Sequence, residues 1–262
     1  GRTTLNGEGL QHQDGHSHVQ ANLIPNCVTY DPTYGYEVAV IVQDGLRRMY
    51  GENENVFYYL TLMNENYQHP AMPEGDDVAA DIIKGIYKLE RVEAKKAKAN
   101  VQLMGSGTIL NEVRKAAQIL SEDYNVSSDV YSVTSFNELA REGQDVVRWN
   151  MLNPEAEQKT AHIGTVITKD AGPAIAATDY IKSYSDQVRA FIDTEYRCLG
   201  TDGFGRSDSR ANLRTHFEVN AAYVVVASLF ELANRGEVEK SVVTEAIKRF
   251  NINTDKLNPL YA

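Results

Sequence analysis

The chain has 262 residues, 42% of them hydrophobic and 24% charged, and can therefore bury the core of one large domain or two small ones. Its formal net charge of −10 argues against a nucleic-acid surface, which needs an excess of Lys and Arg. The longest apolar run, 221–232, contains Ser228 and is shorter than the ~20 residues of a membrane span. Two cysteines, Cys27 and Cys198, are too few for a disulfide framework, so we expect a cytoplasmic protein.

Residues 7–18, with the sequence GEGLQHQDGHSH, hold three histidines, two carboxyl groups and three glycines. Imidazole titrates near neutral pH, and glycine lets the backbone fold closely around a ligand, so this segment is typical of the wall of a site. Because a domain seldom opens on its active loop, we expect that residue 1 is not the natural beginning of the polypeptide.

Three interpretations of this segment are open. His12, His16 and His18 with Asp14 could ligate zinc, although a loop interrupted by glycine lacks the rigid helical face of common zinc motifs. Alternatively, one or two of the histidines line a pocket as proton donors or hydrogen-bonding groups. The third interpretation is purely structural, with loop histidines beside a turn at Asp14-Gly15.

A βαβ unit is predicted next. A strand within 26–31 is followed by a helix over 36–50 that stops at Gly51, and then by a buried strand over 56–62. This order favours a parallel sheet covered by helices. The prolines, glycine and acidic residues of 69–77 indicate a linker.

The rest of the chain alternates strands and helices and predicts an α/β sandwich. Lys95, Lys96 and Lys98 are expected on a solvent-facing hairpin between two strands. The tetrapeptide 135–138 is expected to form a capping box at the start of a helix. The predicted strands are 86–92, 101–104, 130–133, 162–167, 174–176 and 196–199, and the predicted helices include 179–192, 220–236 and 238–250.

Two further glycine-rich segments have ordinary explanations. Gly105-Ser106-Gly107 could bind an anion at a helix N-terminus, but a tight strand-to-helix turn needs the same glycines. The loop 200–210 has three glycines and two arginines and is best interpreted as an ordered loop at a domain or subunit interface. The order and spacing of residues indicate no Ser-His-Asp triad, P-loop or paired thiol.

Several of these segments together resemble the homodimeric bacterial pyruvate dehydrogenase family. They are 7–12 (GEGLQH), 15–18 (GHSH), 24–27 (IPNC), 131–136 (YSVTSF), 200–210 (GTDGFGRSDSR) and 216–219 (HFEV). The resemblance covers essentially the whole chain but only the C-terminal portion of the family's longer polypeptide. It implies the end of a pyrimidine-binding middle domain over 1–72, a linker over 73–84 and a transketolase-like, three-layer α/β domain over 85–262.

This family is the thiamine-diphosphate-dependent first component of the pyruvate dehydrogenase complex. The resemblance implies that pyruvate loses carbon dioxide and that its acetyl unit passes to a lipoyl group of the second component, a dihydrolipoyl acetyltransferase. It also implies catalytic roles for His12, beside the reactive carbon of the cofactor, and for Glu8 close by. No definite role follows for Asp14, His16 or His18.

The family holds thiamine diphosphate and Mg²⁺ through a Gly-Asp-Gly motif and a later Asn, which lie upstream of the matching portion. This chain contains no Gly-Asp-Gly, so the main cofactor and metal ligands are expected to lie outside it, and the isolated chain is expected to be inactive. The alternatives are a non-catalytic dimerisation or docking module and a transketolase-like enzyme acting on sugars. The second is disfavoured because the specific motifs match the dehydrogenase.

Overall fold

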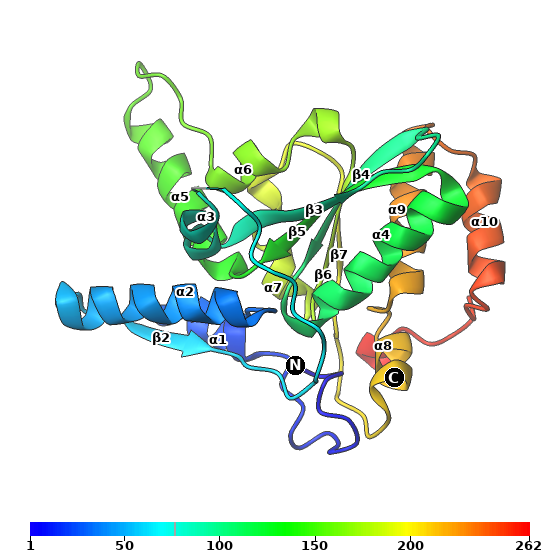
Figure 1. Cartoon of the computed structure of the whole chain (residues 1–262), viewed down its shortest axis with the longest axis horizontal. Coiled ribbons are helices and arrows are strands. Elements are labelled where there is room, and N and C mark those ends of the chain that lie inside the picture. The colour runs from blue at the N-terminus through cyan, green and yellow to red at the C-terminus, as the bar shows by residue number, and fades with distance from the viewer. Residues whose placement is uncertain (76) are drawn as a thin grey trace.

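The computed structural model describes residues 1–75 and 77–262, which form a small N-terminal unit and a larger C-terminal unit (Figure 1). The N-terminal unit contains α1 (Ser17–Asn22), β1 (Cys27–Tyr30), α2 (Gly35–Leu46) and β2 (Phe57–Leu60). One π-helical turn, Arg47–Gly51, extends α2. Strands β1 and β2 pair in parallel, with Cys27 opposite Phe57, which confirms the predicted βαβ unit. β2 is partly exposed rather than buried, because β1 is its only paired neighbour among the described residues.

The C-terminal unit is built on a five-stranded sheet. Its strands have the order β3-β5-β4-β6-β7, and only β3 runs antiparallel to its neighbour. The strands are β3 (Ile86–Val92), β4 (Ala99–Gly105), β5 (Val126–Val133), β6 (Ala174–Ala177) and β7 (Tyr196–Leu199). The helices are α3 (Val78–Lys84), α4 (Leu110–Tyr124), α5 (Phe136–Leu152), α6 (His162–Val166), α7 (Lys182–Asp186), α8 (Arg210–His216), α9 (Ala221–Asn234) and α10 (Lys240–Arg249).

Two hydrophobic cores lie on opposite faces of this sheet. On one face, side chains such as Leu103 and Ile175 pack against α4, α9 and α10. On the other face, Met104 and Ala176 pack against α5, α6 and α7. The alternation of neighbouring strand residues between the two cores follows from the pleat, and it makes the unit the predicted three-layer α/β structure.

Two helices begin at the N-cap residues that the sequence predicts, Ser135 and Asn220. The Ser135 hydroxyl accepts a hydrogen bond from the Glu138 amide at 3.0 Å at the start of α5. Only this half of the predicted capping box forms, since the Glu138 carboxylate pairs with Arg141 instead. The Asn220 side chain likewise caps α9 by accepting from the Tyr223 amide at 3.2 Å.

Three predictions about this unit were wrong. Strands β3 and β4 form no hairpin, because β5 lies between them and pairs with both, so the exposed lysines lie on a crossover connection. Residues 162–166 form α6 rather than a strand, and Ile163 packs into the core from that helix. The helix expected over 179–192 is reduced to α7 and a short 3₁₀ turn at Arg189–Phe191.

The two units share buried contacts. The carboxylate of Glu37, on α2, accepts hydrogen bonds from the Tyr87 and Ser132 hydroxyls, both at 2.6 Å. It also accepts from the Tyr34 amide at 2.9 Å. Burial raises the pKa of Glu37, while these donors oppose the shift by stabilising the charged form. The N-terminal unit is therefore joined to the sheet through a buried polar centre.

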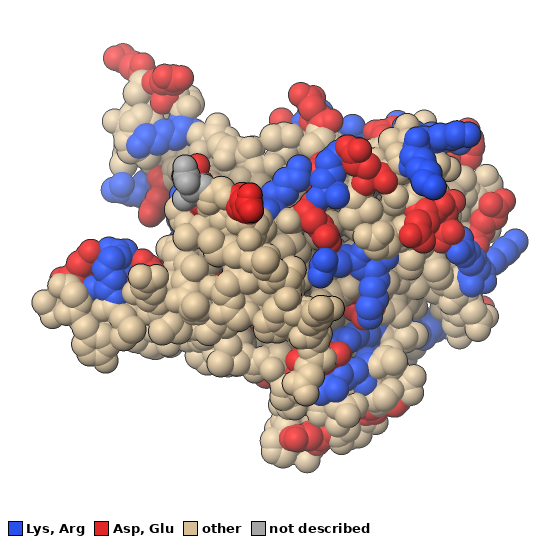
Figure 2. Space-filling view, viewed as in Figure 1, with Lys and Arg blue, Asp and Glu red and all other residues tan. Residues whose placement is uncertain are grey.

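The surface carries both signs of charge. In Figure 2 Lys and Arg alternate with Asp and Glu over the C-terminal unit, and the centre of the view is largely uncharged. Mixed charges of this kind form small local ion pairs such as Arg249–Asp123, at 2.7 Å. Among the described residues, no helix is both long enough and apolar enough to cross a membrane.

Candidate functional site

Residues 5–12 form an irregular loop, here called the His12 loop, that precedes α1. Gly7 and Gly9 have φ values of 92° and 82°, a left-handed conformation that glycine adopts without strain. Hydrogen bonds from the Glu8 amide to the Leu5 carbonyl (3.4 Å) and from the His12 amide to the Gly9 carbonyl (3.2 Å) close two turns. A side chain at Gly9 would collide with the hydroxyl of Ser207, so the loop approaches the C-terminal unit closely at this residue.

His12 and Glu8 lie together on the outer side of this loop. The Nδ1 of His12 is 3.9 Å from a carboxylate oxygen of Glu8, and the side chains are 59% and 54% exposed. A contact at this distance in solvent contributes little to stability. Both side chains are therefore free to meet another molecule, as a proton-transferring pair requires.

Asp14 has a structural role between the His12 loop and α1. Its carboxylate accepts hydrogen bonds from the amides of His16 and Ser17, both at 2.9 Å, and from the Ser17 hydroxyl. Burial disfavours the charged carboxylate, but these hydrogen bonds outweigh burial and lower the pKa of Asp14. The carboxylate thus fixes the entry to α1.

His18 belongs to the core. Its fully buried ring stacks on Tyr184, with ring centroids 4.8 Å apart, and meets the edge of Tyr180 at 4.7 Å. Its Nε2 lies 2.9 Å from the hydroxyl of Thr61. Burial lowers the pKa of His18 to about 3, so the imidazole is neutral at physiological pH.

His16 lines a cavity of about 560 Å³ between the N-terminal segment and the loop 202–205. Its Nδ1 is 3.3 Å from the guanidinium of Arg2, which also donates to the carbonyl of Gly203. The cavity wall is partly polar and partly apolar, and includes Leu10, Gln13, Asp202 and Phe204. Sequence reasoning assigned no role to Arg2, which lies five residues before the histidine-rich segment, or to Gln13, which lies within it.

The three histidines of this segment do not converge. His12 faces Glu8, His16 faces Arg2, and His18 is enclosed by tyrosines. Within 1–75 and 77–262, no group of three or more His, Cys, Asp or Glu side chains is arranged to hold a metal ion. The zinc interpretation therefore has no support from the geometry.

The other glycine-rich segments behave as structural elements. The amide of Gly107 donates to the Asp31 carbonyl at 3.1 Å, so this turn uses its N–H within the protein. The loop 200–210 contacts the N-terminal unit through Arg206 and Arg210 and is thus at an interface, as predicted. Cys27 and Cys198 are both free thiols.

Comparison with protein families identifies both units. Residues 1–70 match the model of the pyruvate dehydrogenase E1 component middle domain. Residues 85–220 match the model of the transketolase-like C-terminal domain. Helix α3 lies between the two matches, within the linker predicted over 73–84, and the exact domain boundaries stay a prediction.

Curated relatives match along the whole chain. The pyruvate dehydrogenase E1 component of Escherichia coli K12 is 63% identical over 264 residues, which cover 100% of this chain and 29% of the relative. The corresponding proteins of Haemophilus influenzae and Pseudomonas aeruginosa are 60% and 54% identical, with coverage of 100% and 99% of this chain. The chain therefore spans about 29% of the length of these relatives.

Solved structures show the same architecture at much lower identity. A transketolase from Leishmania mexicana superposes with a TM-score of 0.61 at 16% identity, over 88% of this chain and 29% of the other. A Pichia stipitis transketolase gives a TM-score of 0.62 at 15% identity, over 89% and 29%. At this identity the likeness concerns the fold alone.

Proposed function

Because the chain belongs to the family of the bacterial pyruvate dehydrogenase E1 component, we propose that it forms part of an enzyme that decarboxylates pyruvate. In this proposal the acetyl unit passes to a lipoyl group on the second component of the complex, a dihydrolipoyl acetyltransferase. The working enzyme is a homodimer that uses thiamine diphosphate and Mg²⁺. The chain contributes one wall of the active site.

The observation that carries this proposal is the exposure of His12 and Glu8 on an otherwise ordered loop. His12 is 59% exposed, whereas the flanking Gln13 is buried, so the backbone is fixed while the imidazole remains available. An imidazole in this position can orient a keto acid through a hydrogen bond and transfer a proton. Glu8, 3.9 Å away, can orient the imidazole or relay a proton.

In this proposal the residues of the chain form one wall of a cofactor pocket, and the main cofactor and metal ligands lie outside the chain. The described residues form no cluster of carboxylates suited to a divalent cation. When bound, thiamine diphosphate supplies the nucleophile for the keto carbon and the sink for the electrons released on decarboxylation. The part proposed for this chain is limited to positioning the substrate and moving protons at His12.

The test is His12→Ala in the complete enzyme polypeptide. Loss of one acid–base group lowers a rate by roughly 10²-fold or more. We expect a fall of this size in the steady-state rate of pyruvate decarboxylation, with the cofactor still bound. The exposed Gln11, next to His12, offers a control, and Gln11→Ala should remain close to wild type.

An unchanged rate for His12→Ala would reduce the loop to a structural role and remove the observation on which the proposal rests. A second measurement concerns the 262-residue chain by itself, which we propose is inactive. Carbon dioxide release from pyruvate by this chain with thiamine diphosphate and Mg²⁺ would contradict that part of the proposal.

A non-catalytic role for the separate chain is the second candidate. Leu10, Phe204 and Leu260 are large apolar side chains that are 47–68% exposed and line the same cavity. Apolar groups that gather on a surface favour association with another protein surface. Sedimentation equilibrium of the chain, at concentrations from micromolar upward, would detect dimerisation in the absence of activity.

A further inference from the structure

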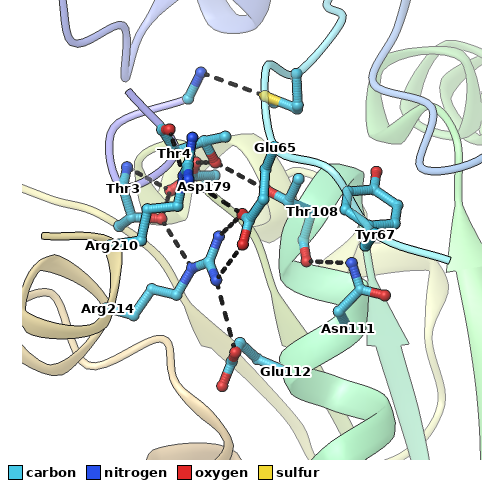
Figure 3. A network of polar contacts seen from close by, with 12 residues as sticks. Thr3, Thr4, Glu65, Tyr67, Thr108, Asn111, Glu112, Asp179, Arg210 and Arg214 are labelled. Carbon is cyan, nitrogen blue, oxygen red and sulfur yellow. Dashed lines mark hydrogen bonds and ion pairs between the residues drawn. The ribbon is translucent and has the colours of Figure 1, made fainter. Parts of the chain in front are cut away.

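Both ends of the His12 loop are attached to the C-terminal unit. The first attachment is at Thr3 and Thr4, which directly precede the loop and are buried. Asp179, two residues beyond the end of β6, accepts hydrogen bonds from the Thr3 amide at 2.9 Å and the Thr3 hydroxyl at 2.7 Å. Its second oxygen accepts from the Thr4 hydroxyl at 2.7 Å (Figure 3). One buried carboxylate thus holds both threonines.

Helix α8 strengthens the first attachment. Arg210 donates from Nε to the carbonyl of Thr4 at 2.8 Å, and Arg214 donates from Nε to the hydroxyl of Thr3 at 3.3 Å. The guanidinium of Arg214 lies between the carboxylates of Glu65 and Glu112 (Figure 3). Because Arg214 is itself paired on both sides, it holds Thr3 in one place.

The second attachment is at Gln13, directly after the loop. Its side-chain amide donates to the carbonyl of Arg206 at 2.6 Å and accepts from the amide of Arg206 at 2.8 Å. Gln13 is buried, so these two bonds are shielded from water. Figure 1 shows the N-terminal loop beside the chain that leads into α8, where this contact is made.

Between the attachments the loop has little support apart from the close approach of Gly9 to Ser207. Its backbone is closed by two long hydrogen bonds, and its two titratable side chains, Glu8 and His12, are more than half exposed. The position of the His12 imidazole therefore depends on where residues 3, 4 and 13 are held. All three are held by residues of the C-terminal unit.

We propose that Asp179, Arg214 and the Arg206 backbone are positioning elements through which the C-terminal unit places His12 for catalysis. This inference rests on the proposed function of His12. Productive geometry must be kept within about 0.5 Å, and a displacement of about 1 Å can cost roughly 10² in rate. In this way the C-terminal unit would act on the reaction through the position of His12.

The experiment compares two matched pairs of substitutions in the complete enzyme polypeptide. Thr3→Val with Thr4→Val removes both hydroxyls and keeps the branched shape, whereas Thr3→Ser with Thr4→Ser keeps both hydroxyls. The readouts are kcat and KM for pyruvate and the hydrogen exchange of the backbone amides of residues 5–12. Gln13→Met tests the second attachment in the same way.

We expect the valine pair and Gln13→Met to lower kcat by about tenfold, within the loss that misplacement by a fraction of an ångström produces. KM should change less, and amide exchange should accelerate in the His12 loop but not in α9. The serine pair should restore kcat and exchange to near wild type, which a general loss of packing would not do.

Equal exchange in the valine and serine pairs would overturn the attachment. Faster exchange with unchanged kcat would overturn the positioning role while leaving the attachment in place. If the wild-type enzyme releases no carbon dioxide from pyruvate, or if His12→Ala is fully active, the proposed function fails and the positioning role fails with it. The exchange measurement would still separate that result from a failure of the attachment.

Discussion

The N-terminal and C-terminal units differ in which residues form their hydrophobic cores. The C-terminal unit has a hydrophobic core on each face of its sheet, made almost entirely from its own residues. The small core of the N-terminal unit, around Val28, Tyr30 and Ile41, is completed by Ile82 and Tyr87 from outside 1–72. About half of the exposed large apolar side chains lie in 1–72, little more than a quarter of the chain.

This difference shows that the N-terminal unit, which carries His12, is held in place by its contacts with the C-terminal unit. The buried ring of Tyr34 packs into a core of the C-terminal unit, and the Glu37 carboxylate accepts from Tyr87 and Ser132 of that unit. His18 packs between Tyr180 and Tyr184. The larger unit supplies rigidity, and the smaller one presents the exposed side chains of Glu8 and His12.

The strongest test of the comparison is to separate the two units. Residues 85–262 expressed alone should unfold in a single cooperative transition, because both cores are retained. Residues 1–72 alone should show no cooperative transition, since a domain of this size is marginal even with a complete core. Circular dichroism during thermal unfolding would check both, and a sharp transition for 1–72 would contradict the dependence.

A smaller effect is expected from the ion pair that joins the units. Arg214→Met would leave Glu65 and Glu112 without their buried partner, and breaking a buried pair typically costs about 3–5 kcal/mol. Urea denaturation of the complete polypeptide would measure the change in unfolding free energy. The exposed pair of Arg249 and Asp123 offers a control, and Arg249→Met should shift the denaturation midpoint little. If Arg214→Met and Arg249→Met changed the unfolding free energy equally, Arg214 would not be a stabilising connection between the units.

The smallest expected effect is a pH dependence at His18. Burial lowers the pKa of this histidine to about 3, whereas the unfolded chain takes up a proton near pH 6.5. The unfolded state therefore binds more protons between these values, and stability falls as the pH is lowered from about 6.5 toward 3. By pH 5 the loss attributable to His18 is about 2 kcal/mol. His18→Gln should flatten the dependence of unfolding free energy on pH between 7 and 5, and an unchanged slope would contradict this account.

The sequence predicted the elements whose signals are local. The βαβ order of the N-terminal unit, the strands at 86–92 and 196–199, and the cap at Ser135 depend on neighbouring residues and were confirmed. The strand expected over 162–167 was wrong because a short run of apolar and β-branched residues suits a strand and a buried helical turn equally well.

Contacts between distant residues had no signal in the sequence. Arg214 and Glu65 are 149 positions apart, and Gln13 and Arg206 are 193 positions apart, so no spacing rule could join them. His18 has the same residue type as His12 but is enclosed by tyrosines that arrive from α7 and its preceding loop. Composition identified the candidate segment, and only the tertiary structure separates its exposed histidines, His12 and His16, from its core histidine, His18.

The position of β5 also has a consequence for synthesis on the ribosome. β3 and β4 are translated first but do not pair with each other. Both pair with β5, which is translated later. At about 5–20 residues per second, the two strands wait for some seconds with unpaired edges until residue 133 has been added. Unpaired apolar strands of this kind associate readily with other chains. The nascent polypeptide is therefore open to chaperone binding or aggregation in this interval, before β5 can insert between β3 and β4.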